Sequence, residues 1–265
     1  MTKDTKLKIV FFGDMVGKSG RYAVCDFLAK KSSEFDFVIA NVENASHGFG
    51  LTEKNYNELS EYGIDCMTSG NHIWDKKDIF EYIDRAEKLI RPANYPEPIG
   101  KGYRIFETPK GKIGVINLLG RTFMPTFDSP RYVAEKAIEE IKKETNVIFI
   151  DFHAEATAEK MCYAKYLSDF GVSALVGTHT HVQTADETIM NGRTAYISDA
   201  GFCGDTESII GMDYESSIKH MLTMLPYRFE VANSGNVCIN GVIITVDAIT
   251  GIAEDIERIN LKKTL

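Results

Sequence analysis

The sequence lacks several features that would point to other classes of protein. No apolar run reaches the roughly 20 residues that a membrane-spanning helix requires, and no Pro-, Gly- or Ser-rich linker divides the chain. Internal repeats and low-complexity tracts are also missing, which argues against a repeat protein or a disordered one. We therefore expect a single domain over residues 1–265.

Cysteine is scarce as well. The chain has five cysteines, an odd number, and none of them forms a Cys-x-x-Cys pair. This pattern is typical of buried or free thiols in a reducing compartment rather than of a disulfide framework. The segment Met1–Lys8 is polar and charged, without the apolar stretch of a signal peptide. We expect a cytoplasmic protein.

Positive charge is in deficit. The chain carries 30 Lys and Arg residues against 38 Asp and Glu residues, for a net charge of −8 that is spread along its length. Such a surface repels phosphate backbones at long range, so long nucleic acid is an unfavourable partner. A small phosphate ligand stays compatible with this charge because bound cations can invert the local field.

The sequence does contain the pattern of an α/β protein. Its 44% hydrophobic and 26% charged residues are ordinary for a globular chain that buries a core without disulfides. Short apolar runs alternate with helical patterns, which favours a largely parallel sheet.

Sheet strands are expected at Leu7–Phe12, Phe37–Ala40, Asp65–Thr68, Val147–Phe152, Ala174–Val176 and Thr194–Ile197. Antiparallel pairs are expected for Tyr103–Thr108 with Ile113–Leu118, around a turn at Lys110–Gly111, and for Val237–Val246 with Ile252–Ile259. Helices are expected near Arg21–Lys31 and at Asn55–Tyr62, Lys76–Glu87 (with Asp75 as N-cap), Ala134–Glu144, Glu159–Phe170 and Ser216–Leu225.

Polar side chains follow most of the expected sheet strands directly. They are Asp14, Glu43, Asn44, Asn71, His72, His153, His179 and His181. Functional groups of α/β proteins gather at the carboxyl ends of the strands. A lone Asp or Asn at such a place usually caps a turn, and a lone His is usually structural. The recurrence at equivalent places favours a shared site. The other two histidines, His47 in a glycine-containing loop and His220 in a helix, are interpreted as structural.

The residue types favour metal chemistry. Imidazole together with carboxylate and amide oxygen suits Mn²⁺, Fe²⁺ or Zn²⁺. Seven ligands are too many for one tetrahedral ion, but they suit two ions roughly 3.5–4 Å apart, the arrangement that serves displacement at phosphorus. A P-loop nucleotidase is a rival interpretation, because Gly13–Ser19 follows a strand and precedes a helix. That loop is one residue too short between its glycines, and it leaves the histidines unexplained.

The chain resembles the calcineurin-like metallophosphoesterases and, more closely, the YmdB-type bacterial phosphodiesterases. Motifs over nearly the whole length carry the resemblance: Phe12–Lys18, Asn41–Ala45, Ser69–Asp75, Asp151–Glu155, Gly177–Thr184 and Ile210–Asp213. Val16 stands where most calcineurin-like enzymes have a His, and Glu43 replaces their usual bridging Asp. The YmdB-type family shares both departures.

The resemblance implies a central β-sandwich flanked by helices in αββα layers, two divalent metal ions, and a homo-oligomer. Asp14, Glu43, Asn44 and His181 would hold one metal. Glu43, Asn71, His153 and His179 would hold the other, with Glu43 as the bridge. A metal-bridging hydroxide would hydrolyse a 2′,3′-cyclic nucleotide to a nucleoside monophosphate, and His72 would be a catalytic residue that steadies the phosphoryl oxygens or protonates the leaving oxygen.

Substrate contacts and two alternative functions stay open at this point. Arg121 and Lys18 could each reach a phosphate, although either could equally form a surface ion pair. Phe123 and Met124 could stack a base, but such residues more often serve packing. The protein could instead be a regulatory metal- or nucleotide-binding protein that acts through a partner, or a phosphomonoesterase or 5′-nucleotidase, because the same metal pair serves those reactions.

Overall fold

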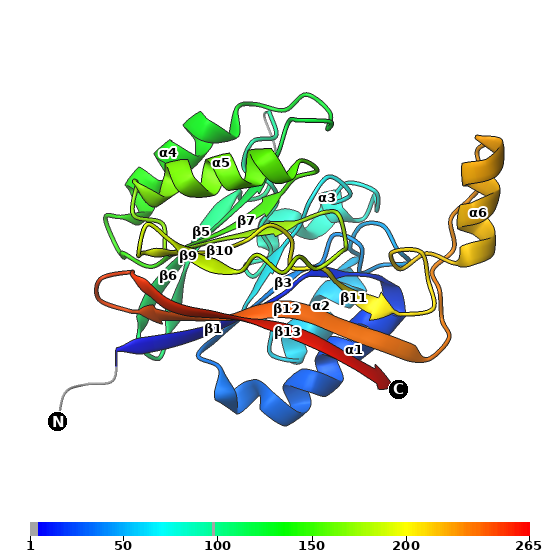
Figure 1. The fold of residues 1–265 in the computed structure, drawn as a ribbon, viewed down its shortest axis with the longest axis horizontal. Helices are drawn as coiled ribbons and strands as arrows, with labels where there is room; N and C mark the ends of the chain where they lie inside the picture. Colours follow the sequence, from blue (N-terminus) through cyan, green and yellow to red (C-terminus); the bar gives the residue numbers. More distant parts are fainter. Residues whose placement is uncertain (1–4, 97–98) are drawn as a thin grey trace.

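The computed structural model describes residues 5–96 and 99–265 as two β-sheets packed face to face, with helices on both outer faces (Figure 1). The first sheet has the strand order β2 (Asp14–Met15), β11 (Phe202–Asp205), β12 (Asn236–Asp247), β1 (Lys6–Phe12), β3 (Phe37–Asn41), β4 (Cys66–Thr68), with β13 (Ala253–Thr264) also paired to β12. The second has the order β5 (Tyr103–Thr108), β6 (Gly111–Leu119), β7 (Ile148–His153), β8 (Ala174–Thr178), β10 (Thr194–Ile197), β9 (Thr188–Met190).

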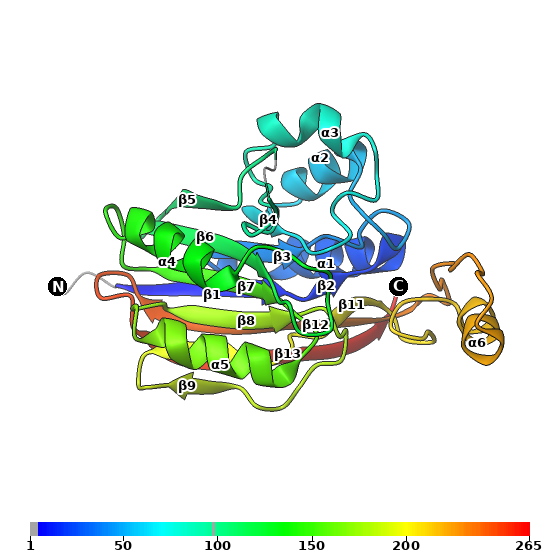
Figure 2. The ribbon, with the colours of Figure 1, turned by 90° about the horizontal axis from the view of Figure 1, so that it is seen from above.

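The helices cover the two outer faces of this sandwich (Figure 2). The first sheet carries α1 (Gly17–Lys31), α2 (Glu53–Glu61) and α3 (Ile79–Tyr82), and the second carries α4 (Pro130–Ile141) and α5 (Thr157–Ser168). Within the described ranges, none of the helices combines the length and apolarity needed to cross a bilayer.

Three apolar cores follow from the alternation of side chains along the strands. On β1, Ile9 and Phe11 face the second sheet, whereas Val10 and Phe12 face α1. On β7, Phe149 lies between the sheets, and Ile148 and Ile150 pack under α4 and α5. The expected αββα layering and the mixture of parallel and antiparallel strands are therefore confirmed.

The predicted helix over Lys76–Glu87 is wrong. The chain has only the short helix α3 there, followed by the 3₁₀ turn Ile83–Arg85. Asp75 does not cap a helix, because its carboxylate lies 2.8 Å from Nδ1 of His72. The carboxylate of Asp78 accepts a hydrogen bond from the backbone of α2 instead of from its own helix, and this tertiary contact overrides local helix propensity.

Parallel pairing brings the carboxyl ends of both sheets to one edge of the sandwich. β1 and β3 run parallel with Phe12 opposite Ala40, and β7 and β8 run parallel with His153 opposite Thr178. The loops that follow these strands carry the polar residues identified from the sequence. The edge of the sandwich is therefore the place to look for a site.

Candidate metal centre

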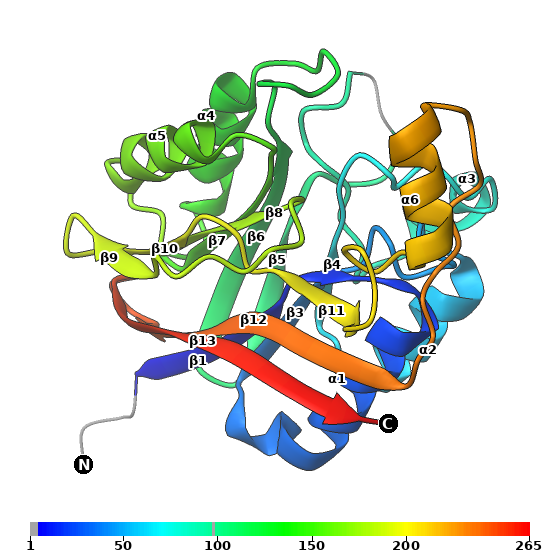
Figure 3. The same ribbon diagram turned by 45° about the vertical axis from the view of Figure 1, so that its right-hand side comes forward.

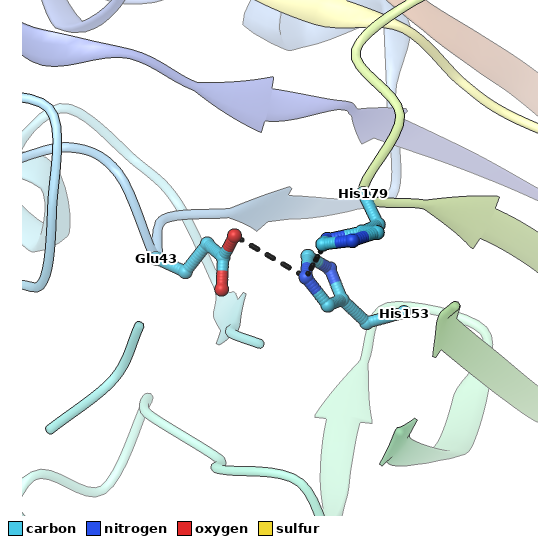
Figure 4. A group of neighbouring side chains, drawn as sticks. All are labelled: Glu43, His153 and His179. Atoms are coloured by element: carbon cyan, nitrogen blue, oxygen red, sulfur yellow. Dashed lines mark hydrogen bonds and ion pairs between the residues drawn. The ribbon is translucent and has the colours of Figure 1, made fainter. Parts of the chain in front are cut away.

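One group of ligand atoms is formed by Glu43, His153 and His179 (Figure 4). Nε2 of His153 lies 3.2 Å from Oε1 of Glu43 and 3.0 Å from Nδ1 of His179. Oδ1 of Asn71 lies 3.1 Å from the same His153 nitrogen. Ligand atoms of the first three residues lie within 4.8 Å of one another, which is a spacing that one cation could span.

A second group is formed by Asp14, Glu43 and His181. Nε2 of His181 lies 3.7 Å from Oδ1 of Asp14, and the Asn44 amide lies 3.2 Å from that same imidazole nitrogen. Nδ1 of His181 lies 2.9 Å from the carbonyl oxygen of Ile210, which fixes the ring. The structure thus places every residue of the predicted ligand set in one of two adjoining clusters, and Glu43 belongs to both.

Two buried oxygen atoms in this site have no hydrogen-bond partner among the described residues: Oδ1 of Asp14 and Oδ1 of Asn44. Buried polar atoms nearly always have a hydrogen-bond partner or bind an ion. The two unpaired oxygens therefore indicate that a partner such as a cation binds here. A carboxylate oxygen and an amide oxygen are both acceptors with free lone pairs, so each can coordinate a cation. The donor set therefore fits divalent cations of the type that take mixed nitrogen and oxygen ligands.

The site is packed closely around these groups at Gly70. A Cβ atom at this position would lie 2.2 Å from Oε2 of Glu43 and 2.4 Å from Nε2 of His153. Any side chain would displace both groups. The glycine in the Gly-Asn-His motif is therefore required by the close approach of the backbone to the ligand cluster.

Burial and neighbouring charges change the pKa values of imidazole and carboxylate groups in this site. Burial alone would lower the pKa of His153, but Glu43 and Asp14 outweigh it and raise this pKa to about 9. Burial raises the pKa of Asp14. Burial and the neighbouring charge of His153 lower the pKa of His179 to about 3. Because metal ligands must be deprotonated, a cation entering here would displace a proton.

The loop after β8 is held in an uncommon backbone conformation. His179 has φ +100° and His181 has φ +62°, a region that costs non-glycine residues of order 1–3 kcal/mol. The backbone N–H of His179 donates to Asp14 over 3.1 Å, and that of Thr180 donates to Asp199 over 3.1 Å. Both imidazoles are turned toward the carboxylates by this strained loop, and such strain is typical of functional sites.

Sequence reasoning missed two buried carboxylates that support the ligands. Asp151 accepts a hydrogen bond from Thr178 over 2.7 Å and another from Thr68, and burial raises its pKa to about 7. Thr178 in turn lies 3.0 Å from Nδ1 of His153. Asp199 forms a buried ion pair with Lys160 at 2.9 Å and braces the Thr180 backbone. Asp151 is the first residue of the Asp151–Glu155 motif identified from the sequence, but no role was predicted for it.

His72 lies beside the ligand groups without belonging to either of them. Its backbone N–H donates to Oε2 of Glu43 over 3.0 Å, and its Nδ1 lies 2.8 Å from the Asp75 carboxylate. Its ring packs against Phe49 at 4.8 Å between centroids. The ring is thereby oriented by a carboxylate, as in sites where an imidazole transfers protons.

The other residues singled out in the sequence lie elsewhere. Arg121 is exposed, and its backbone N–H donates to the Glu159 carboxylate over 3.0 Å. Lys18 is exposed, with its ammonium 5.0 Å from the centroid of the Tyr22 ring. Neither lines the cavity over the ligand groups. Likewise His47 is exposed, and His220 contacts Phe229 and the Leu225 carbonyl.

A cavity of about 420 Å³ opens over the ligand groups. Glu43, Asn44, His72, His179 and His181 line one end of it. Its volume lies within the range of about 300–1,000 Å³ that small-molecule sites occupy. The cavity is thus large enough for a ligand of nucleotide size.

Comparison with known proteins gives the family. A model of YmdB-like proteins matches residues 10–259. A curated relative, the 2′,3′-cyclic-nucleotide 2′-phosphodiesterase of Bacillus subtilis, is 49% identical over 96% of both chains. Among solved structures, a novel phosphatase from Mycoplasma pneumoniae has a TM-score of 0.90 at 36% identity and covers 98% of this chain and 94% of its own. A hypothetical protein from Thermus thermophilus has a TM-score of 0.91 at 34% identity, over 97% and 100%. The chain therefore belongs to the YmdB-like family.

Proposed function

We propose that the protein is a phosphodiesterase that hydrolyses 2′,3′-cyclic nucleotides to nucleoside monophosphates at a site for two divalent cations. The single observation that carries this proposal is the position of Glu43, whose carboxylate belongs to both ligand groups. A shared carboxylate is the usual bridge of a two-metal site. The Bacillus relative, at 49% identity, supports the substrate class.

The residues would be divided between the two cations. Asp14, Asn44 and His181 would hold one, Asn71, His153 and His179 would hold the other, and Glu43 would hold both. Bound there, two divalent cations supply Lewis acidity that activates a water molecule and offsets charge on phosphoryl oxygens. Manganese, iron and zinc all suit this donor set. The homo-oligomeric state stays a prediction from the family resemblance.

His72 supplies the proton that the leaving ribose oxygen needs. Its Nδ1 is engaged by Asp75 at 2.8 Å, which leaves Nε2 for proton transfer. The side chain is 31% exposed and lines the cavity, so it can reach a bound ligand. General acid catalysis by a positioned histidine contributes about 10²–10⁴-fold in rate.

The first test is turnover by the purified protein loaded with manganese. Three substrates are compared: 2′,3′-cyclic AMP, 3′,5′-cyclic AMP and a phosphomonoester. We expect selective hydrolysis of the 2′,3′ ring. Preferred hydrolysis of the monoester would identify a phosphomonoesterase instead. No turnover of any of the three, with two metal ions bound, would favour a regulatory binding protein.

The Glu43→Gln variant tests the bridge itself. Glutamine keeps the shape of the side chain but removes the charge that both cations would share, so turnover should fall at least about a hundredfold and bound metal should drop, both measured on the same preparation. Glu61→Gln is the comparison, because Glu61 is exposed and lies outside both ligand groups and the cavity lining. It should keep its metal. Near wild-type activity of Glu43→Gln would refute the bridging role.

A further inference from the structure

The far wall of the cavity comes from a part of the chain that stands away from the sandwich. The helix α6 (Tyr214–Thr223) projects beyond the end of the sheets near β11 (Figures 1 and 2). In the turned view of Figure 3 it lies in front, next to the loop that follows β11. Ser217 and Met221 of this helix line the cavity, as does Phe229 in the segment that returns from it. Ile209, Ile210 and Met212 also line the cavity, and the carbonyl oxygen of Ile210 lies against His181.

The projecting helix is held firmly at its base. The backbone N–H of Asp213 donates to the carbonyl oxygen of Glu230 over 2.7 Å, and that of Ala232 donates to the carbonyl oxygen of Gly211 over 3.1 Å. These bonds join the chain entering the helix to the chain leaving it. Asp213 also caps the helix, since its carboxylate accepts from the backbone of Ser216 over 2.9 Å. The base fixes where Met221 and Phe229 lie relative to the ligand groups.

Ser217 gives an independent sign of a missing ligand. Its side chain is 4% exposed, and its hydroxyl oxygen has no hydrogen-bond partner among the residues that the structure describes. Leaving a buried polar atom unpaired destabilises the folded state. Most of the other residues of α6 are exposed. Ser217 is instead buried where the helix lines the cavity.

The cavity is lined by two kinds of side chain. The ligand groups around Glu43 are charged or metal-binding, whereas α6 and the segment after it contribute Met221, Phe229 and the unpaired hydroxyl of Ser217. A 2′,3′-cyclic nucleotide also combines two such parts, an anionic phosphate and a flat base with polar edges.

We propose that α6 and the segment after it form a nucleobase subsite, in which the ring of Phe229 and the side chain of Met221 cover the face of the base and the Ser217 hydroxyl bonds its edge. This proposal rests on the proposed function and adds the specificity for a base-bearing substrate. Met221 is 67% exposed, so a base seated there would remove apolar surface from water. Base–aromatic stacking tolerates any base because each has a π face.

The test compares a substrate that has a base with one that lacks it. Steady-state kinetics are measured on 2′,3′-cyclic AMP and on ribose 2′,3′-cyclic phosphate with the manganese-loaded protein. Phe229→Ala should raise KM for the nucleotide about tenfold, which corresponds to about 1.4 kcal/mol, with kcat within about twofold. For the ribose phosphate, KM should stay unchanged. Phe229→Tyr, which keeps the ring, should restore the nucleotide KM.

Two matched variants separate the subsite from general damage to the projecting helix. Lys219→Ala removes a largely exposed side chain of the same helix, and Leu222→Ala removes a 78% exposed neighbour of Met221. Neither residue lines the cavity, so both variants should keep the wild-type KM. Equal losses on both substrates in Phe229→Ala would overturn the proposal, as would a raised KM in both control variants.

Ser217→Ala tests the hydroxyl separately. If it bonds the base, KM for the nucleotide should rise about three- to tenfold, with no change for the ribose phosphate. An unchanged KM for the nucleotide would overturn the role of the hydroxyl.

Binding measurements keep this proposal distinct from the proposed function. Calorimetry with 3′-AMP and ribose 3-phosphate, which differ at the base, does not depend on turnover. Tighter binding of 3′-AMP in the wild-type protein, lost in Phe229→Ala, supports the subsite even if no cyclic nucleotide is hydrolysed. Equal affinity for the two ligands in the wild-type protein overturns the subsite even if the enzyme hydrolyses 2′,3′-cyclic AMP.

Discussion

At the residue scale, His72 differs from the other three site histidines because it belongs to neither ligand group. His153, His179 and His181 lie among carboxylates and imidazoles that could hold a cation, whereas Nδ1 of His72 pairs with the partly exposed carboxylate of Asp75. Because His72 belongs to neither ligand group, its proposed proton transfer does not require it to bind metal. The two roles can therefore be separated by measuring rate and metal content on the same variant.

We predict that His72→Asn lowers kcat by about 10²–10⁴-fold, the usual contribution of a general acid, with two metal ions still bound. Rates on 2′,3′-cyclic AMP and elemental analysis of the same sample check this. Asp75→Asn should have the smaller effect, because it removes only the group that orients the ring. Loss of metal in His72→Asn would show that the residue is a ligand and contradict the role proposed for it.

The sequence allowed the ligand positions to be predicted because each one follows a strand. Asp14, Glu43 and His153 can be placed at the carboxyl ends of strands from apolar runs alone. Asp151 and Asp199 could not be identified in this way. Both are completely enclosed, and their partners Thr68, Thr178 and Lys160 are distant in the sequence. Supporting residues of this kind are defined only by the packing of the two sheets.

At the scale of elements, helix boundaries were predicted to within a few residues where an amphipathic pattern ends in solvent. The helix expected over Ser216–Leu225 is α6, at Tyr214–Thr223. The failure at Lys76–Glu87 has a different origin. Ile79, Tyr82 and Ile83 are all buried in the core under the first sheet, and the Tyr82 hydroxyl donates to Leu51 over 2.8 Å. Contacts from other elements fix these side chains, so the chain tightens into a 3₁₀ turn.

One buried ion pair links helix α5 to Asp199, which supports the loop after β8. Nζ of Lys160, which is 1% exposed, lies 2.9 Å from Asp199, and Asp199 accepts from the backbone and the hydroxyl of Thr180. We predict that Lys160→Met lowers the free energy of unfolding by about 3–5 kcal/mol, because it leaves a buried carboxylate without its counter-charge. Urea unfolding of the metal-free protein measures this.

Lys143→Met is the control for that measurement. Lys143 also pairs with a carboxylate, that of Glu140, but both side chains are largely exposed. Such surface pairs contribute about 0–1 kcal/mol, so the unfolding midpoint should hardly move. Similar destabilisation in the two variants would mean that the buried pair has no special part in supporting the loop between β8 and His181.

At the scale of the whole molecule, the αββα layering was predicted through the family resemblance, and the parallel order through the alternation of strands and helices. The projecting position of α6 was not predictable. Its sequence has an ordinary amphipathic pattern, and only the backbone bonds at its base show that it leaves the sandwich. Residues at the edge of the sandwich and residues of α6 together line the cavity.

The sandwich edge also predicts how metal affects stability. Asp14 and Glu43 are buried side by side with three imidazoles, and a cation that binds only the folded state stabilises it by mass action. At free manganese about a hundred times its Kd, one site adds about 2.7 kcal/mol, and a chain of this size gains roughly 2–4 °C in Tm per kcal/mol. Calorimetric scans with chelator and with manganese should therefore differ by at least about 5 °C, and by more when both sites are filled. In Glu43→Gln the difference should shrink, because the shared ligand is lost. Identical Tm values for the wild-type protein under the two conditions would mean that the two ligand groups do not bind this cation.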